Sequence, residues 1–217
     1  YPKTCLQPIK EEYLLNGSLE NTNEAYAIAK ISGLRLCHYL RKQYDFDAIS
    51  LMPTNLYGPG DNYNSLNSHV LPSLIKRFSN AKLENKKSVI CWGSGKPLRE
   101  FLHVSDLGDA AIFALKNWDP NLGLKNQAST DSLITHLNVG TGKDISIQDL
   151  ADLISTKIGF GGETVWDKSK PDGTQKKQLD VTRINKLGWS SKIPLEKGIE
   201  QTIIDYNKEL TSKTIRE

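Results

Sequence analysis

Short apolar runs alternate with amphipathic stretches along the chain, and this alternation predicts the strands and helices of an α/β protein. Ala48–Met52 is an apolar run that ends at Pro53, which is typical of a buried strand. The stretch before it places Ala27, Ile31 and Leu34 on one face of a helix. The same patterns predict further strands at 88–92, 101–104, 136–139 and 163–166, and helices at 24–43, 68–79, 105–117, 147–158, 181–187 and 195–210.

Polar residues at the ends of these segments predict where helices begin. Asn21 with Glu24 resembles a capping pair that opens the first helix. Ser146 is the expected N-cap of a later helix, and either Ser105 or Asp106 caps another. The stretches without an apolar period are predicted to be loops, namely 1–20, 53–60, 118–132 and 167–178.

Two features bear on the architecture. No Gly-x-Gly-x-x-Gly follows a predicted strand, and the βαβ units that open a doubly wound sheet are missing. The chain has 217 residues, enough for one large domain or one and a half, and it starts at a tyrosine. We therefore expect the C-terminal part of a doubly wound, Rossmann-type parallel sheet with a smaller α/β substrate-binding domain.

Charge and cysteine content exclude several classes of protein. The 28 basic and 25 acidic residues are interspersed, which favours a soluble surface over a nucleic-acid-binding stripe. No apolar stretch approaches the ~18 residues of a membrane span. Cys5, Cys37 and Cys91 lie far apart, so neither a metal site nor a disulfide framework is indicated. This usage suits a reducing cytoplasm.

The first helix carries a candidate acid/base pair. Tyr26 and Lys30 are four residues apart and therefore share a helix face. A free tyrosine titrates near pH ~10, and a neighbouring lysine cation favours the phenolate and lowers the pKa of the phenol. The pair can thus act as a general acid/base. Taken alone, it fits better an amphipathic helix whose two long side chains reach water.

The segments around this pair and further along the chain change that balance. They are Asn21–Lys30, Met52–Pro59, Asn67–Val70, Trp92–Gly95, Arg99–Val104 and Ser169–Thr174. Together they resemble the GDP-L-fucose synthase family of extended short-chain dehydrogenase/reductases, in order and over essentially the whole chain. The family carries a Gly-rich cofactor turn, a catalytic serine and an epimerising cysteine before the Tyr-Pro pair that opens this sequence.

The resemblance implies 3,5-epimerisation and then NADPH-dependent 4-reduction of GDP-4-keto-6-deoxy-D-mannose, by a cytoplasmic homodimer with no nucleic-acid or membrane partner. It implies that residues 1–60 end the NADP-binding Rossmann-type domain. Residues 61–217 then form mainly the GDP-sugar-binding domain, with segments around 100–140 returning to the Rossmann part. We expect this oxidoreductase and epimerase activity in the complete protein and none in the isolated 217-residue chain.

Site roles follow from the same resemblance. Tyr26 protonates the C4 oxygen, and Lys30 lowers the tyrosine pKa and holds the nicotinamide ribose. His69 exchanges protons at C3 and C5, a role suited to imidazole. The cofactor-binding set is Tyr26, Lys30, Pro53, Thr54, Asn55, Leu56 and His69, the substrate-binding set is Arg77, Trp92, Arg99, Asp172 and Lys177, and the histidines expected to be structural are His38, His103 and His136.

Other interpretations stay open at this point. The chain also fits another nucleotide-sugar epimerase, dehydratase or reductase of the same superfamily, although His69 argues against a 4,6-dehydratase. It fits, too, a non-catalytic fragment that binds nucleotide-sugars. Outside its motif, a lone histidine is more often structural, and an arginine near a helix end is as often a solvated surface charge.

Overall fold

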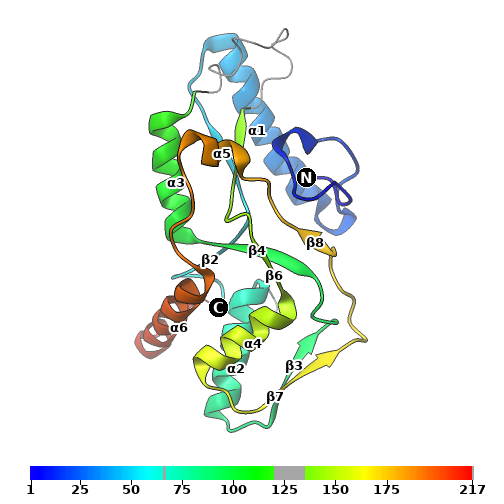
Figure 1. The fold of residues 1–217 in the computed structure, drawn as a ribbon, viewed down its shortest axis with the longest axis vertical. Coiled ribbons are helices and arrows are strands. Elements are labelled where there is room, and N and C mark those ends of the chain that lie inside the picture. Colours follow the sequence, from blue (N-terminus) through cyan, green and yellow to red (C-terminus); the bar gives the residue numbers. More distant parts are fainter. Residues whose placement is uncertain (66, 120–134, 217) are drawn as a thin grey trace. The chain divides into compact units, whose positions relative to one another are not determined.

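The computed structural model describes residues 1–65, 67–119 and 135–216, which form two compact units (Figure 1). Each unit combines helices with parallel strands, so the α/β class predicted from the sequence is confirmed. Unit 1 contains Tyr1–Thr54, Leu107–Gly142 and Gln178–Ser190, and unit 2 contains Asn55–Asp106, Lys143–Lys177 and Ser191–Glu217.

Unit 1 is built around one parallel strand pair. Its elements are η1 (Glu11–Tyr13), η2 (Asn21–Asn23), α1 (Glu24–Tyr44), β1 (Ser50–Pro53), most of α3 (Val104–Asn117), β5 (His136–Val139) and α5 (Thr182–Leu187). β1 pairs with β5 in parallel, with Pro53 opposite Val139. All four residues of β5 are buried, and η1 and α5 pack against this strand. Burial along the whole strand is the pattern of a covered parallel sheet.

The connection from α1 to β1 is held by a buried arginine. Arg41 donates from its guanidinium to Asp47 Oδ1 at 2.7 Å and to the Ala48 carbonyl at 2.9 Å. Asp45 ends the helix in the left-handed region at φ 53°. Both elements lie within a few residues of their predicted positions. The predicted capping pair at the start of α1 is wrong, because Asn21 belongs to η2 and the N-cap makes no side-chain hydrogen bond.

Unit 2 has two small sheets and three packed helices. Its elements are β2 (Asn55–Tyr57), α2 (Val70–Leu83), β3 (Ser88–Trp92), β4 (Leu98–His103), β6 (Asp144–Ser146), α4 (Ile147–Ile158), β7 (Glu163–Asp167), β8 (Lys176–Lys177) and α6 (Leu195–Ser212). In one sheet, β4 pairs with β2 and β8 in parallel and with β6 antiparallel. In the other, β3 and β7 run in parallel.

The core of unit 2 lies where α4 packs against α2 and α6 (Figure 1). Ile75 and Phe78 from α2, Ile154 from α4 and Ile199 from α6 are completely buried in it. The Phe78 ring lies 5.6 Å from that of Phe160, which follows α4. Burial of such side chains contributes roughly 1.5–3 kcal/mol each, and this core holds the helices that carry the site described below.

The predicted caps in unit 2 have opposite outcomes. Ser146 is confirmed, because its Oγ accepts a hydrogen bond from the Asp149 backbone N–H at 2.9 Å. The cap predicted at Ser105 or Asp106 is wrong, because α3 already begins at Val104. Asp106 instead accepts hydrogen bonds through its carboxylate from the backbone N–H groups of residues 192 and 193.

Three short strands were missed by the sequence patterns. β2 lies inside the predicted loop 53–60, and β8 lies inside the predicted loop 167–178. β6 ends at Ser146, the N-cap of α4. Most of the predicted loop 118–132 lies outside the described residues. Among the helices of the described residues, none is long and apolar enough to cross a membrane.

Candidate functional site

In unit 1, α1 presents the predicted acid/base pair on one face. The Lys30 Nζ lies 5.5 Å from the centroid of the Tyr26 ring. Tyr26 is 61% exposed, so its phenol is open to a bound molecule. The pair can therefore transfer a proton to or from a ligand at this face of α1.

The end of β1 lies beside the end of β5. The Thr54 backbone N–H donates to the Val139 carbonyl at 3.0 Å, which extends the pairing by one residue beyond Pro53. Ligands of open α/β sheets bind at this carboxyl edge of parallel strands. Asn55 and Leu56 follow in unit 2 on β2, where the Asn55 side-chain amide donates to the Glu100 carbonyl at 2.8 Å.

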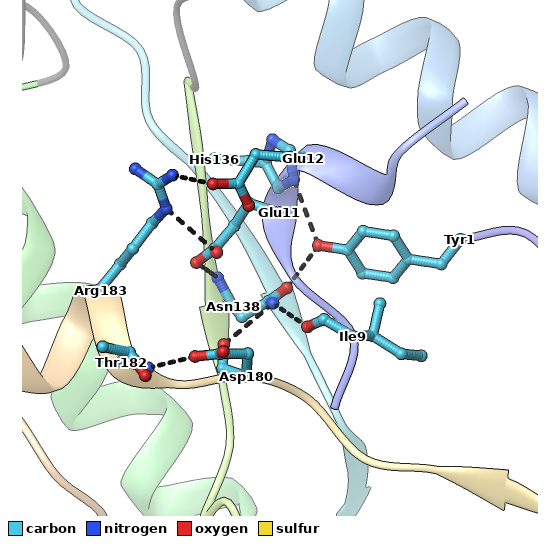
Figure 2. A network of polar contacts seen from close by, with 9 residues as sticks. All are labelled: Tyr1, Ile9, Glu11, Glu12, His136, Asn138, Asp180, Thr182 and Arg183. Carbon is cyan, nitrogen blue, oxygen red and sulfur yellow. Dashed lines mark hydrogen bonds and ion pairs between the residues drawn. The ribbon is translucent and has the colours of Figure 1, made fainter. Parts of the chain in front are cut away.

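A buried polar network supports the end of β5 (Figure 2). Asn138 is completely buried and its Nδ2 donates to the carbonyls of Ile9, at 2.8 Å, and Asp180, at 3.1 Å. Its Oδ1 accepts a hydrogen bond from the Tyr1 hydroxyl, and its backbone N–H donates to Glu11 Oε1 at 3.1 Å. Three chain segments are thus joined at the residue that precedes Val139.

Charged and titratable groups complete this network. Arg183 pairs with Glu11, with Nε and Oε2 3.2 Å apart, and with Glu12 (Figure 2). Burial raises the pKa of Glu11, an effect that Arg183 partly offsets. The Tyr1 hydroxyl lies 3.2 Å from His136 Nε2, and burial is the main cause that lowers the pKa of His136 to about 4. The network therefore holds a neutral imidazole at physiological pH.

In unit 2, His69 occupies the N-cap position of α2 and is exposed. Its backbone carbonyl accepts from Ser73 at 3.0 Å. Burial raises the pKa of Asp61, and the nearby His69 and Arg216 partly offset that rise. His69 is thus an accessible imidazole beside a carboxyl group, an arrangement that suits proton exchange with a ligand.

The other three histidines are buried. His103 packs edge-on against the Tyr57 ring, with centroids 5.3 Å apart, and its Nδ1 accepts a hydrogen bond from the Ser105 backbone. His136 belongs to the network of unit 1, and His38 packs edge-on against Tyr39 at 5.0 Å. Their surroundings are those of packed side chains.

A pocket of about 270 Å³ opens in unit 2, at the low end of small-molecule sites. It brings together two predicted substrate-binding residues, Arg77 and Trp92, with the guanidinium carbon 5.3 Å from the indole centroid. Arg77 also donates to the Ile90 carbonyl at 3.0 Å. The remaining lining residues are Ser65, Ser68, Val70, Ser73, Leu74, Cys91, Ile147 and Trp166. An arginine against an indole suits an anion attached to a flat aromatic ring.

The other predicted substrate-binding residues lie near the start of β4. Arg99 is opposite Lys177 in the β4–β8 pairing. Burial lowers the pKa of Arg99, which Asp172 partly restores. Asp172 accepts two hydrogen bonds from Ser94, in the turn that follows Trp92. None of these three residues lines the pocket itself.

Sequence reasoning missed two aromatic and basic neighbours of the pocket. Trp166 pairs with Cys91 across β3 and β7 and lines the pocket. Lys170 places its Nζ 5.8 Å from the centroid of Trp92. The parallel register of β3 and β7 would have identified Trp166, but the sequence alone does not give that register.

Comparisons with known proteins give a consistent result. Residues 1–124 match the model of the NAD dependent epimerase/dehydratase family. The chain is 49% identical over 212 residues to "Probable GDP-L-fucose synthase 1" of Oryza sativa subsp. japonica, covering 98% of this chain and 61% of that protein. It is 50% identical over 202 residues to "GDP-L-fucose synthase" of Escherichia coli K12, covering 93% and 62%.

Solved structures resemble the fold. A GDP-L-fucose synthetase from Naegleria fowleri bound to NADP superposes with a TM-score of 0.87 at 28% identity, covering 100% of this chain and 63% of that chain. A GDP-6-OMe-4-keto-L-xylo-heptose reductase from C. jejuni superposes with a TM-score of 0.88 at 35% identity, covering 96% and 68%. The fold is therefore the Rossmann-like one of these enzymes, and the chain spans about three fifths of the curated relatives' length.

Proposed function

The chain belongs to the NAD dependent epimerase/dehydratase family, and from that premise we propose that it is part of a GDP-L-fucose synthase. The complete enzyme converts GDP-4-keto-6-deoxy-D-mannose to GDP-L-fucose by 3,5-epimerisation and NADPH-dependent 4-reduction. The observation that carries the proposal is the exposed Tyr26–Lys30 pair on α1. Identities of 46–50% to GDP-L-fucose synthases support the choice within the family.

The reduction depends on proton delivery to the sugar. Reduction of a ketone at C4 leaves an oxygen that must gain a proton, and Tyr26 donates it from its exposed hydroxyl. Lys30 places its ammonium 5.5 Å from the centroid of the Tyr26 ring, beside the side chain that donates this proton. Its position four residues along α1 keeps the two groups on one face.

The chain offers a suitable site for the nicotinamide end of NADPH. Lys30 makes no ion pair within the part of the chain that the structure describes, so its ammonium can bind ribose hydroxyls. Thr54 stands at the carboxyl end of β1, where its backbone is fixed by Val139. NADPH, when bound, supplies the hydride for C4. Within unit 1, the residues that would hold it are Tyr26, Lys30, Pro53 and Thr54.

Epimerisation requires a group that removes a proton next to the carbonyl and another that returns one on the opposite face. His69 is the candidate for one of these two groups, because its imidazole is exposed and an imidazole can both accept and donate a proton. The residues on either side of it, Ser68 and Val70, both line the pocket of unit 2. His69 thus stands at the edge of that pocket.

The same pocket is proposed to hold the GDP part of the substrate. Trp92 offers an aromatic surface that is 63% exposed, and Arg77 lies against it with its permanent charge. Arg99 and Lys177, opposite each other in the β4–β8 pairing, form the neighbouring part of the proposed substrate-binding surface. In this scheme unit 1 carries the Tyr26–Lys30 pair and unit 2 the residues proposed to bind the GDP-sugar.

We also propose that the enzyme is a cytoplasmic homodimer without nucleic-acid or membrane partners. Free cysteines at positions 5, 37 and 91 support a reducing compartment. Exposed apolar side chains along α1, among them Ile28 and Leu36, support a partner on that helix. Light scattering of the full-length protein measures the mass, and a monomeric mass would contradict the dimer.

Two substitutions separate the two half-reactions. His69→Asn in the full-length protein should abolish epimerisation and spare the reduction of substrate that is already epimerised. Tyr26→Phe should do the reverse, so that protons at C3 and C5 still exchange with solvent while reduction stops. Each variant is the matched control of the other. Equal loss of both half-reactions in the His69 variant would refute its assigned role.

A second candidate is the C4 reduction of another GDP-linked keto sugar without epimerisation. The similarity to a GDP-6-OMe-4-keto-L-xylo-heptose reductase, at a TM-score of 0.88, favours this candidate. The configuration of the product at C3 and C5 distinguishes the two candidate functions. A reductase of this kind leaves the configuration at C3 and C5 unchanged, whereas the synthase inverts both.

A further inference from the structure

The turn that follows β3 has an unusual backbone. Gly93 and Gly95 both have positive φ, +83° and +75°, which side-chain-bearing residues rarely adopt. A Cβ at position 93 would lie 2.4 Å from Asp172 Oδ1. Only glycine at this position lets the carboxylate come so close to the turn. Gly93 therefore allows a close contact between the turn and Asp172.

Asp172 is hydrogen-bonded to Ser94, the residue between the two glycines. Its Oδ1 accepts from the Ser94 backbone N–H at 2.8 Å, and its Oδ2 accepts from the Ser94 hydroxyl at 2.6 Å. The same hydroxyl accepts from the Lys96 backbone N–H at 3.2 Å. The bonds from Ser94 lower the pKa of Asp172, so the carboxylate is ionised at neutral pH and both oxygens already accept.

The held turn carries the aromatic wall of the pocket. Trp92 directly precedes it, within 5.3 Å of the Arg77 guanidinium carbon and 5.8 Å of Lys170 Nζ. On its other side, a Cβ on Gly95 would lie 2.8 Å from the Trp166 ring, so the turn also packs against the second indole of the pocket. A shift of this turn would therefore displace both tryptophans.

We propose that Asp172 is a positioning residue of the nucleotide pocket, which holds Ser94 and thereby sets Trp92 against Arg77 and Lys170. The inference rests on the proposed function, because it takes GDP as the ligand of this pocket. Asp172 then acts through the turn, and this role replaces the direct substrate contact that the sequence resemblance implies for it. Lys170, in the same loop, adds a second cation beside Trp92 for the diphosphate.

The test measures GDP affinity by calorimetry, and KM and kcat by turnover, for full-length Asp172→Ala, Ser94→Ala and the double variant. Asp172→Ala should weaken GDP binding and raise KM by about tenfold, with kcat within about twofold. Ser94→Ala should lose less affinity, because the backbone N–H of residue 94 still donates to Asp172. The double variant should bind no more weakly than Asp172→Ala, because that change already removes both bonds. Asp172→Asn keeps an acceptor and gains a donor for Ser94, and it should restore most of the affinity.

The matched control is Ser169→Ala, which removes a similar 2.6 Å bond to Asp167 in the same loop without touching the turn, and should leave GDP affinity unchanged. Wild-type affinity in Asp172→Ala would overturn the proposal. Additive losses in the double variant would also overturn it. If the wild-type protein binds no GDP, the proposed function itself is refuted. If the wild type binds GDP and the variants do not follow the pattern above, only the role of Asp172 is refuted.

Discussion

Acidification should destabilise the protein through His136. Burial is the main cause that lowers the pKa of this imidazole from 6.5 to about 4, and Arg183 adds to the effect. Between these two pH values His136 is protonated in the unfolded chain and neutral in the folded chain. Stability is therefore fully present above about pH 6.5 and is lost as the pH falls toward about pH 4.

The size of the effect follows from this window. A shift of 2.5 units corresponds to about 3 kcal/mol in all, of which about 2 kcal/mol is lost between about pH 7 and about pH 5. Glu11 opposes the loss at the acid end, because its raised pKa makes protonation favour the folded state. For this reason the comparison stops at about pH 5.

The assay is urea unfolding of the full-length protein at both pH values, for the wild type and for His136→Gln. Glutamine removes the titration and retains an N–H that can donate to the Tyr1 hydroxyl. The variant should lose about 2 kcal/mol less than the wild type on acidification. Ile112→Ala, at an exposed position without a titrating group, is the control and should lose as much stability on acidification as the wild type. Equal losses in His136→Gln and wild type would refute the reasoning.

Three further outcomes are expected. Gly95→Ala should lower both the melting temperature and the GDP affinity, because φ is +75° and the new Cβ would lie 2.8 Å from the Trp166 ring. Calorimetry measures both quantities, and wild-type values would contradict this packing. Ile154→Ala, fully buried, should cost about 2–5 kcal/mol in chemical unfolding, whereas Ile112→Ala, 57% exposed, should cost little; equal costs would contradict the assigned core. Tyr26→Phe should lower kcat for reduction by about a hundredfold or more, and an unchanged kcat would remove it from catalysis.

Much of the fold could be predicted from the sequence because its elements carry local signals. The strand at 88–92 and the helix capped by Ser146 have clear apolar patterns, and both are confirmed. β2, β6 and β8 have two or three residues each, and pairing with β4 defines them as strands. Such pairing is a tertiary property that no local pattern contains.

The candidate site divides in the same way. The Tyr26–Lys30 pair follows from helical spacing, and the structure places both residues on one face of α1. The hydrogen bonds between Asp172 and Ser94 join residues that are 78 positions apart in the sequence. The local sequence around either residue therefore does not predict this contact. Trp166 reaches the pocket only through the register of β3 and β7.

The most direct test of the central claim is the reaction of the full-length protein with GDP-4-keto-6-deoxy-D-mannose and NADPH in heavy water. We predict GDP-L-fucose in which C3 and C5 both carry solvent deuterium, because epimerisation exchanges these hydrogens, while C4 carries hydrogen from NADPH. Nuclear magnetic resonance of the product locates each isotope. A reduced product without deuterium at C3 and C5, or no reduction at all, would contradict the account.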